Sequence, residues 1–227
     1  MADQGAGQVS EPEETPIIIP TNAKVLIVGD SFVRRAEDIL RKLYPSLNLM
    51  VVALGQQTPD ILELYYSCLP RINRFGPTHV ILHEGHNQMA KDKHRNPVAM
   101  ISRDVADYTL KFALIIKRHY PLARVFISAM LPRTFSHRVA FTRSDVMAFN
   151  TRAKRHGQRV RTLAGRNGLE CVINNFVWRT ITTSTEESDY YENDGIHLDA
   201  GGMKMQTREW LTEIFRPIKP VPKEKNQ

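Results

Sequence analysis

The stretch KVLIVGDS, residues 24–31, contains the signals that decide the fold. Its first five residues form a short apolar run rich in β-branched side chains, which is typical of a buried strand. Gly29 then allows a sharp turn, and Asp30 or Ser31 can cap a following helix. Apolar residues recur after this point at helical spacing. The face of this helix that packs on the core is expected to carry Phe32, Ala36, Ile39, Leu40 and Leu43.

The same alternation of strand and helix signals continues to residue 215. Four more apolar runs predict strands, at residues 49–54, 79–83, 124–130 and 169–173. Cap and proline signals predict four further helices, which begin at Pro59 and Asp60, after Pro97, at Ser144 and Asp145, and near Gly201. Strands that alternate with helices form a parallel sheet covered on both faces. Sites in such sheets lie beyond the carboxyl ends of the strands.

Length and composition bound the class of protein. The chain has 227 residues, of which 42% are hydrophobic, enough for one domain with a real core. No apolar run approaches the roughly 18–20 residues of a membrane span, and the acidic N-terminus has no apolar segment typical of a secretory signal. Two cysteines, Cys68 and Cys171, argue against a disulfide-built scaffold. An intracellular, cytoplasmic protein is therefore expected.

Composition also divides the chain into a domain and two tails. Residues 1–20 predict a disordered acidic tail, because they contain four acidic residues and no basic ones. Residues 217–227 predict a disordered basic tail, and residues 21–216 form the predicted domain. The net charge is +7, and its positive excess lies in that domain. This charge favours an acidic partner, which is either nucleic acid or an anionic membrane surface.

Chemically useful residues follow the predicted strands. Ser31 comes after the first strand at a helix N-terminus, Gly55 after the second and Asn87 after the third. Asp194 and His197 precede the last helix and are three residues apart, so a turn can bring the carboxylate to the imidazole. A hydroxyl nucleophile, a histidine base, an orienting carboxylate and N–H donors are the parts of an acyl-transfer site.

Each part has an ordinary structural alternative. Ser31 is also a good N-cap, Gly55 a turn glycine, and Asn87 a turn or cap residue. Asp194 and His197 could form a solvated loop pair. The order of the parts favours the acyl-transfer site, because each lies at the end of a separate strand or just before the final helix.

The same residues resemble a known family. GDS (29–31), Gly55, GHNQ (85–88) and DGIHL (194–198) look like the four sequence blocks of the SGNH, or GDSL-type, esterases and lipases. The resemblance implies a three-layer α/β/α flavodoxin-like fold with a five-stranded parallel sheet, and chemistry without a metal or cofactor. The third block often reads Gly-x-Asn-Asp, and Gln88 here replaces its Asp, which puts the support of Asn87 in doubt.

The resemblance also implies roles for individual residues. Ser31 would be the nucleophile, His197 the general base and Asp194 the acid that orients it. Ser31, Gly55 and Asn87 would form the oxyanion hole. The short GDS-to-DGIHL frame and the basic, cysteine-poor composition are also similar to the esterase domain of the first open-reading-frame protein of LINE-type retrotransposons.

Three functions compete at this point. The leading hypothesis is a serine esterase that hydrolyses short acyl esters, such as acetyl esters, or lipid esters through an acyl-enzyme. The alternative is a catalytically weak SGNH-like module that binds anionic lipid or RNA through its basic surface. A carbohydrate O-acetyl esterase would need an open groove of aromatic side chains. Binding of RNA by this domain is less expected than binding of lipid, because no known RNA-binding module is present. The oligomeric state is not predicted.

Other patterns remain open. Arg152, Arg155 and Arg159 share one face of the helix 144–166, which is either a solvated basic face or a surface for phosphates. The aromatic segments 131–143 and 174–192 could form an acyl pocket, a lid or a membrane-touching rim, or they could cover the sheet edge. Around Glu84, His83 and His86 lack a third ligand at a known spacing, so a metal site is not expected.

Overall fold

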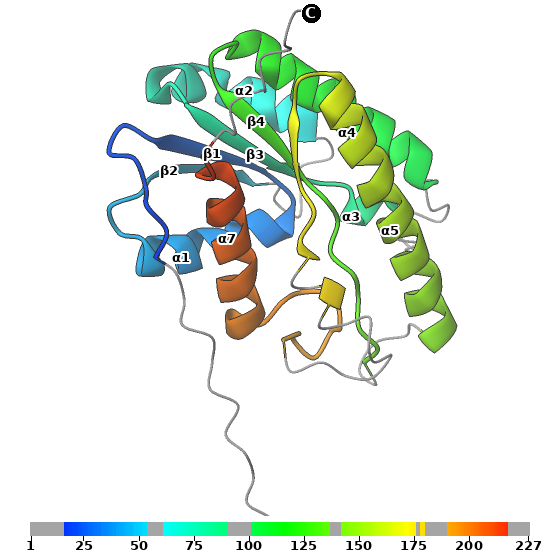
Figure 1. Cartoon of the computed structure of the whole chain (residues 1–227). Helices are drawn as coiled ribbons and strands as arrows, with labels where there is room; N and C mark the ends of the chain where they lie inside the picture. The colour runs from blue at the N-terminus through cyan, green and yellow to red at the C-terminus, as the bar shows by residue number, and fades with distance from the viewer. Residues whose placement is uncertain are drawn as a thin grey trace, which may run out of the picture.

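The structure is a computed structural model, which describes residues 16–53, 61–89, 101–136, 142–175, 178–179 and 190–217. Within these residues, five parallel strands form one sheet in the order β2-β1-β3-β4-β5 (Figure 1). The strands are β1 (Lys24–Gly29), β2 (Asn48–Ala53), β3 (His79–His83), β4 (Arg124–Ser128) and β5 (Glu170–Val172). All five predicted strands are confirmed, and β4 and β5 are each shorter than predicted.

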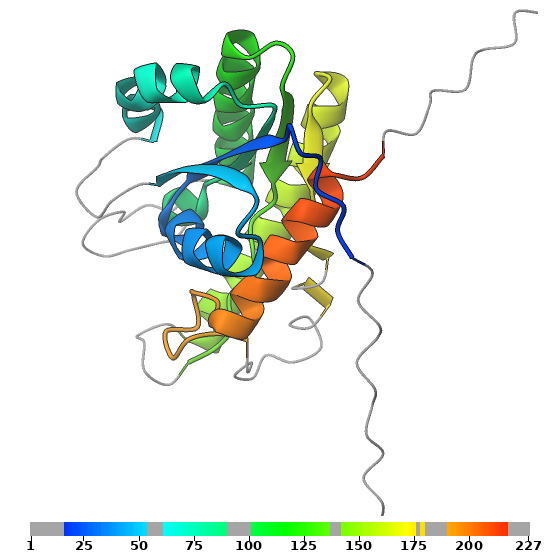
Figure 2. The same ribbon diagram turned by 90° about the vertical axis from the view of Figure 1, so that its left-hand side faces the viewer.

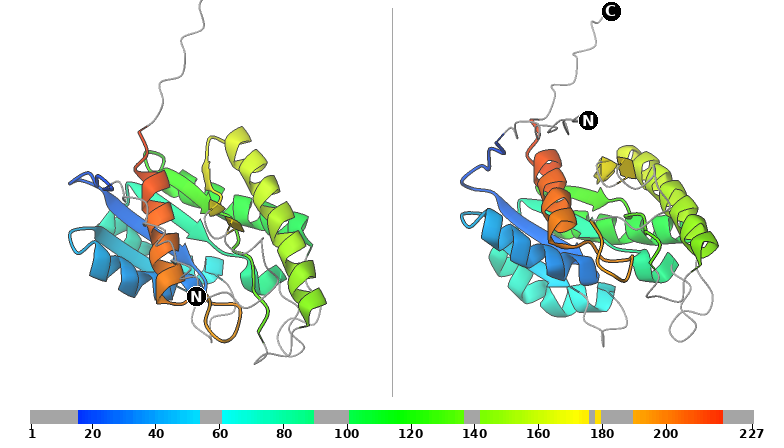
Figure 3. Two further views of the ribbon diagram at one scale, coloured as in Figure 1. Left: turned by 60° about the horizontal axis from the view of Figure 1, so that its bottom comes forward. Right: turned by 90° about the horizontal axis from the view of Figure 1, so that it is seen from below.

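Helices cover both faces of this sheet, which confirms the predicted three-layer α/β/α fold (Figure 2). The described helices are α1 (Ser31–Leu43), α2 (Ile61–Phe75), α3 (His86–Met89), α4 (Ser102–His119), α5 (Arg143–Arg166) and α7 (Ala200–Ile214). Helices α1 and α7 pack side by side on one face, as the right view of Figure 3 shows. Helices α2, α4 and α5 pack on the other face.

The continuous apolar run of β1 is explained by burial on both sides. Val25 and Ile27 belong to the cluster beneath α1 and α7, whereas Leu26 and Val28 belong to the cluster beneath α2, α4 and α5. All four side chains are fully buried. Successive strand residues point to opposite faces, so a strand in the middle of a three-layer fold needs apolar residues at every position.

Two predicted helix details are wrong. Leu43 is predicted to face the core but is 38% exposed, because it is the last residue of α1 and the buried stripe of this helix ends at Leu40. Helix α5 is capped by Thr142 rather than by Ser144 or Asp145. Thr142 accepts the N–H of Asp145, whose carboxylate accepts the N–H of Thr142 in return, and this reciprocal pair places the helix start earlier.

Several predictions fall outside the described residues. The expected start of α2 at Pro59 and Asp60 is among them, as are nearly all of the predicted tails. No described helix combines the length and the apolar character that crossing a membrane would require. The predicted site residues follow β1, β2 and β3 or lie in the segment that leads into α7.

Candidate active site

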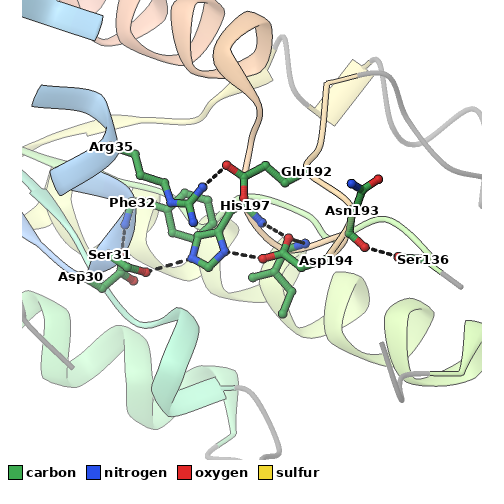
Figure 4. Close-up of polar contacts among 10 residues, drawn as sticks. Asp30, Ser31, Phe32, Arg35, Ser136, Glu192, Asn193, Asp194 and His197 are labelled. Atoms are coloured by element: carbon green, nitrogen blue, oxygen red, sulfur yellow. Dashed lines mark hydrogen bonds and ion pairs between the residues drawn. The ribbon is translucent and has the colours of Figure 1, made fainter. Parts of the chain in front are cut away.

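Ser31 and His197 meet at the carboxyl edge of the sheet. Ser31 is the first residue of α1, and its Oγ lies 3.1 Å from His197 Nε2 (Figure 4). His197 belongs to the segment 190–199 that leads into α7. The distance is within the hydrogen-bond range that proton transfer from a hydroxyl to an imidazole requires. The fold therefore joins two residues that are 166 positions apart in the chain.

Asp194 completes a continuous chain of hydrogen bonds. Its Oδ2 lies 2.6 Å from His197 Nδ1, and its Oδ1 accepts the backbone N–H groups of Ile196 at 2.8 Å and His197 at 2.9 Å. Burial would raise the pKa of the Asp194 carboxyl, but the hydrogen bonds from the His197 side chain and from these two amides hold its pKa below the usual value. The carboxylate is therefore charged near neutral pH, and it fixes the Nδ1 proton of the ring. Nε2 then presents its lone pair to Ser31.

The Asp194 segment is anchored to the chain that follows β4. Thr134 donates its N–H to the carbonyl of Gly195 at 2.9 Å, and the Ser136 hydroxyl donates to the carbonyl of Asn193 (Figure 4). Gly195 has φ of +65°, and a Cβ there would lie 2.4 Å from the Thr134 carbonyl oxygen. Position 195 in DGIHL therefore requires glycine for two reasons. Its backbone is in the left-handed region, and a side chain there would collide with the Thr134 carbonyl.

Gly29 serves a different purpose from the one predicted. It is the last residue of β1 and not part of a sharp turn. A Cβ at this position would lie 2.0 Å from the carbonyl oxygen of His83 on the neighbouring strand. That same carbonyl accepts the N–H of Asp30 at 3.3 Å. Glycine is needed here because β1 and β3 approach closely just before the Ser31 helix begins.

Asp30 caps the start of α1, the helix whose first residue is Ser31. Its Oδ1 accepts the N–H of Phe32 at 3.0 Å, and its Oδ2 lies 3.4 Å from His86 Nδ1. Burial would raise the pKa of this carboxyl, but the facing His86 side chain and the Phe32 amide lower its pKa overall. Asp30 is therefore a buried anion that caps α1 and fixes the position of Ser31.

The predicted oxyanion donors are only partly described. Ser31 lies at the N-terminus of α1, where backbone N–H groups favour negative charge. Asn87 lies in the short helix α3 directly after β3, and it is exposed. Gln88, where the family often has Asp, donates from Nε2 to Glu84 Oε1 at 2.7 Å and so supports α3 in another way. Gly55 lies outside the described residues.

One buried group of side chains has the composition of a metal site. Ligand atoms of Asp30, His83 and His86 lie within 4.8 Å of one another. The N–H of Leu131 donates to His86 Nε2 at 3.1 Å, so a neutral ring carries its proton on Nδ1, facing Asp30. His83 Nδ1 is hydrogen-bonded to Ser128 Oγ at 2.9 Å. Asp30 Oδ2, His83 Nε2 and His86 Nδ1 have no hydrogen-bond partner among the described residues. A cation between them would have to displace the His86 proton, which argues against a metal site.

A second such group surrounds His197. Glu192, Asp194 and His197 also have ligand atoms within 4.8 Å of one another. Glu192 forms an ion pair with Arg35, which lies one turn after Ser31 on α1 (Figure 4). The pair bridges α1, which carries Ser31, and the segment that carries His197. Arg35 could have been suspected from its spacing to Ser31, but no sequence signal connects it with Glu192.

The basic face of α5 is less uniform than its sequence pattern indicates. Arg159 forms a bidentate ion pair with Asp107 of α4, with distances of 2.8 and 3.0 Å from its Nη2 to the two carboxylate oxygens. Arg152 is half-buried, and only Arg155 of the three is exposed. The stripe therefore contains one paired, one half-buried and one exposed arginine, which narrows the surface that it can offer to phosphates.

Described aromatic residues of the two open segments pack inward. The Trp178 indole donates to the carbonyl of Met130 at 3.2 Å, and the buried Tyr191 hydroxyl donates to the carbonyl of Pro132 at 2.5 Å. Both rings thus cover the chain that follows β4, which agrees with the interpretation of these two aromatics as a cover of the sheet edge. Phe141 and Phe176 lie outside the described residues.

Comparison with known proteins gives a fold likeness and no sequence family. No protein-family model matches the chain, and no curated protein matches it. Among solved structures, a GDSL-like lipase from Bacteroides thetaiotaomicron is similar with a TM-score of 0.61 and 14% identity, over 88% of this chain and 90% of that one. The fold is that of the GDSL-type hydrolases.

Two other solved structures show the same likeness. A catalytic mutant of an acetylxylan esterase from Geobacillus stearothermophilus gives a TM-score of 0.59 at 14% identity, covering 86% of this chain and 95% of that chain. An alpha/beta hydrolase enzyme from the metagenome of Lake Arreo, Spain, gives 0.59 at 15% identity, covering 88% of this chain and 98% of that chain. At this level of identity the likeness establishes the arrangement of sheet and helices, whereas the chemistry depends on the side chains described above.

Proposed function

We propose that this protein is a serine hydrolase that cleaves carboxylic esters through an acyl-enzyme. The observation that carries the proposal is the continuous chain from Ser31 Oγ through the His197 ring to Asp194. Its three members come from the start of α1 and from the segment before α7, where Asp194 also accepts the backbone N–H of His197. The likeness to a lipase and to an acetylxylan esterase agrees with this chemistry.

The proposed reaction has two steps. In the first, His197 Nε2 takes the Ser31 proton while Oγ attacks the acyl carbon, and the ring then gives this proton to the departing alcohol as the ester bond breaks. In the second, His197 takes a proton from water, which attacks the acyl-enzyme, and returns the proton to Oγ as the acid leaves. Asp194 stays ionised throughout and stabilises the imidazolium that forms in each step.

The negative charge of each tetrahedral intermediate needs donors. The proposed set is the backbone N–H of Ser31 at the N-terminus of α1, the side-chain amide of Asn87 and the backbone N–H of Gly55. The loss of one such donor typically costs about 2.7–4 kcal/mol in the transition state. The position of Asn87 directly after β3, beside the strand that ends at Gly29, agrees with this role.

We propose short acyl esters, such as acetyl esters, or lipid esters as the substrate class. The solved neighbours act, by their names, on acetylated xylan or on lipids, and the two classes differ in the length of the acyl chain. The similarity to the esterase domain of retrotransposon proteins stays a prediction that rests on the sequence frame. The alternative, a binding module with little activity, requires that the Ser31–His197–Asp194 chain be catalytically silent.

The test is hydrolysis of a series of p-nitrophenyl esters, from acetate to longer acyl chains, together with labelling by a fluorophosphonate. We expect hydrolysis and a covalent adduct on Ser31 in the wild type, and loss of both in Ser31→Ala and His197→Ala. Ser67→Ala is the matched control, because Ser67 is an exposed helix serine that bonds only to its own turn and to Cys68. Absence of both hydrolysis and labelling in the wild type would favour the binding module.

A further inference from the structure

A cavity of about 300 Å³ lies beside the sheet edge formed by β5. Its described lining comes from three places: Ala129 after β4, one face of α5, and Ile173, Asn175, Trp178 and Arg179 after β5. None of Ser31, Asn87, Asp194 and His197 is among the described lining residues. The proposed hydrolysis therefore does not account for this cavity, whose volume is at the lower end of small-molecule sites.

The floor of the cavity is apolar. It consists of Ala129, Ala153, Gly157, Ile173 and the ring of Trp178. The indole N–H of Trp178 already donates to the Met130 carbonyl, so it offers no hydrogen bond to a ligand. A Cβ at Gly157 would lie 3.3 Å from Ala129 Cβ, which shows how closely α5 approaches the end of β4 here. The lining also contains two polar side chains, Gln158 and Asn175, which are exposed like the basic residues. The buried and half-buried part of the lining is apolar, so it suits a hydrocarbon chain.

The rim of the cavity is cationic. Lys154, Arg161 and Arg179 are exposed lining residues, and the described lining contains no Asp or Glu. None of the three forms an ion pair with a described carboxylate, in contrast to Arg159 on the same helix, which is paired with Asp107. Lys154 and Arg161 are seven residues apart, two turns along one face of α5. Among the described residues, the rim thus offers positive charge without a paired carboxylate beside an apolar floor.

We propose that this cavity binds an amphipathic anion, with an alkyl chain on the floor and its charged head between the rim cations. A medium-chain fatty acid has this chemistry, and so does a monoalkyl phosphate. The site is separate from the proposed ester hydrolysis, and its test does not depend on activity. Arginine forms paired hydrogen bonds with carboxylate and phosphate alike, so the head group must be distinguished by experiment.

Titration with decanoate and with decyl phosphate, both below their micelle concentrations, tests the proposal. Trp178 reports on the cavity by its fluorescence, because Trp210, the second of two tryptophans, is fully buried and bonded to Ser128. We expect saturable changes in emission, confirmed by calorimetry, and much weaker binding of the neutral decanol. In Trp178→Phe the change in emission should disappear while the calorimetric signal remains.

Charge variants locate the site. The double variant Arg161→Gln/Arg179→Gln should weaken decanoate binding roughly three- to ten-fold, because each partly solvated charge pair contributes up to about a factor of five. The matched control is Arg155→Gln/Arg166→Gln, which removes two exposed cations of the same helix outside the lining. The proposal is overturned if neither probe binds, if decanol binds as tightly as decanoate, or if the control weakens binding equally.

A further control separates this cavity from an acyl pocket. Decanoate should bind to protein whose Ser31 is blocked by a fluorophosphonate as tightly as to free protein. If the block abolishes the Trp178 response, decanoate occupies the catalytic site as a product and the second site does not exist. If Ser31 is never labelled but decanoate still binds, the proposed hydrolysis fails while this proposal stands.

Discussion

Replacement of Asp194 by asparagine should remove catalysis while leaving the fold intact. Asp194 Oδ1 accepts two backbone N–H groups, so the amide oxygen of the new side chain must remain at that position. The amide NH₂ then occupies the place of Oδ2, 2.6 Å from His197 Nδ1, and donates to it. The ring must carry its proton on Nε2 instead, so it can no longer accept the proton of Ser31.

The expected loss follows from this change of tautomer. A wrong tautomer at the equivalent position of a serine protease lowers kcat by about 10⁴, which corresponds to about 5 kcal/mol in the transition state. Stability should change little, by about 1 kcal/mol or less, since the Asp194–His197 pair is partly solvated and both backbone bonds remain. The assay is kcat/KM on p-nitrophenyl acetate, with thermal unfolding of the same samples.

Asp194→Ala is the informative control, because it removes the backbone bonds as well as the carboxylate. It should lose activity to a similar extent but also lose roughly 1 kcal/mol or more of stability. Activity of Asp194→Asn within ten-fold of the wild type would refute the orienting role. Equal destabilisation of both variants would refute the argument that the amide oxygen keeps its two N–H partners.

Four shorter predictions can be checked with the same protein. Asn87→Ala should lower kcat on p-nitrophenyl acetate about 10²–10³-fold with little change in KM, since the amide serves the oxyanion; a change in KM alone would contradict this role. Ser128→Ala should cost about 1–3 kcal/mol in urea unfolding, because it leaves the Trp210 N–H and a His83 nitrogen buried without a partner. Burial lowers the pKa of both His83 and His156 to about 3, whereas the unfolded chain binds their protons near pH 6.5. The stability that depends on these histidines should therefore be full above pH 6.5 and fall toward pH 4. His156→Leu should reduce this dependence, and an unchanged slope of stability against pH would exclude His156 as a cause. The protein should bind weakly to vesicles that contain phosphatidylserine and should dissociate from them at high salt. Equal sedimentation with phosphatidylcholine vesicles, or tighter binding to single-stranded RNA, would reverse the expected order of partners.

The sequence predicted what depends on local pattern. The strand at 24–28 is visible because a central strand of a three-layer fold must be apolar at every position. The Asp194–His197 contact is visible because a spacing of three residues allows one turn to close it. Leu43 and the α5 cap were misjudged because several residues compete within one helical turn, and tertiary packing or a reciprocal cap decides among them.

Contacts between distant elements could not be predicted in this way. Arg35 and Glu192 are 157 positions apart, and neither residue type is unusual at a surface. The need for glycine at position 29 comes from a carbonyl on another strand, which no local pattern reveals. The hydrogen bonds that join Ser128, Asn174 and Trp210 are likewise buried contacts between separate elements. Such contacts become visible only when strand order and register are known.

The same arrangement of an aspartate beside a histidine occurs twice among the described residues, and the two copies differ in the partner of the second ring nitrogen. Asp30 and Asp194 each accept, through Oδ1, the N–H of the residue two positions later, and each faces a histidine through Oδ2. In the buried copy, no hydroxyl can follow the histidine, because His86 Nε2 accepts the N–H of Leu131 and has no lone pair left for a hydroxyl proton. In the other copy the carboxylate is partly solvated, and His197 Nε2 faces Ser31.

An aspartate beside a histidine is therefore not enough to identify a base. The two histidines differ in the partner of the second ring nitrogen: His86 accepts a backbone amide and supports the helix start, whereas His197 faces a hydroxyl and is the proposed base. In the sequence, His197 lies three residues after Asp194, whereas His86 lies 56 residues after Asp30, so only the first pair is visible there. The partner of each second ring nitrogen, the Leu131 amide for His86 and the Ser31 hydroxyl for His197, becomes visible only in the fold.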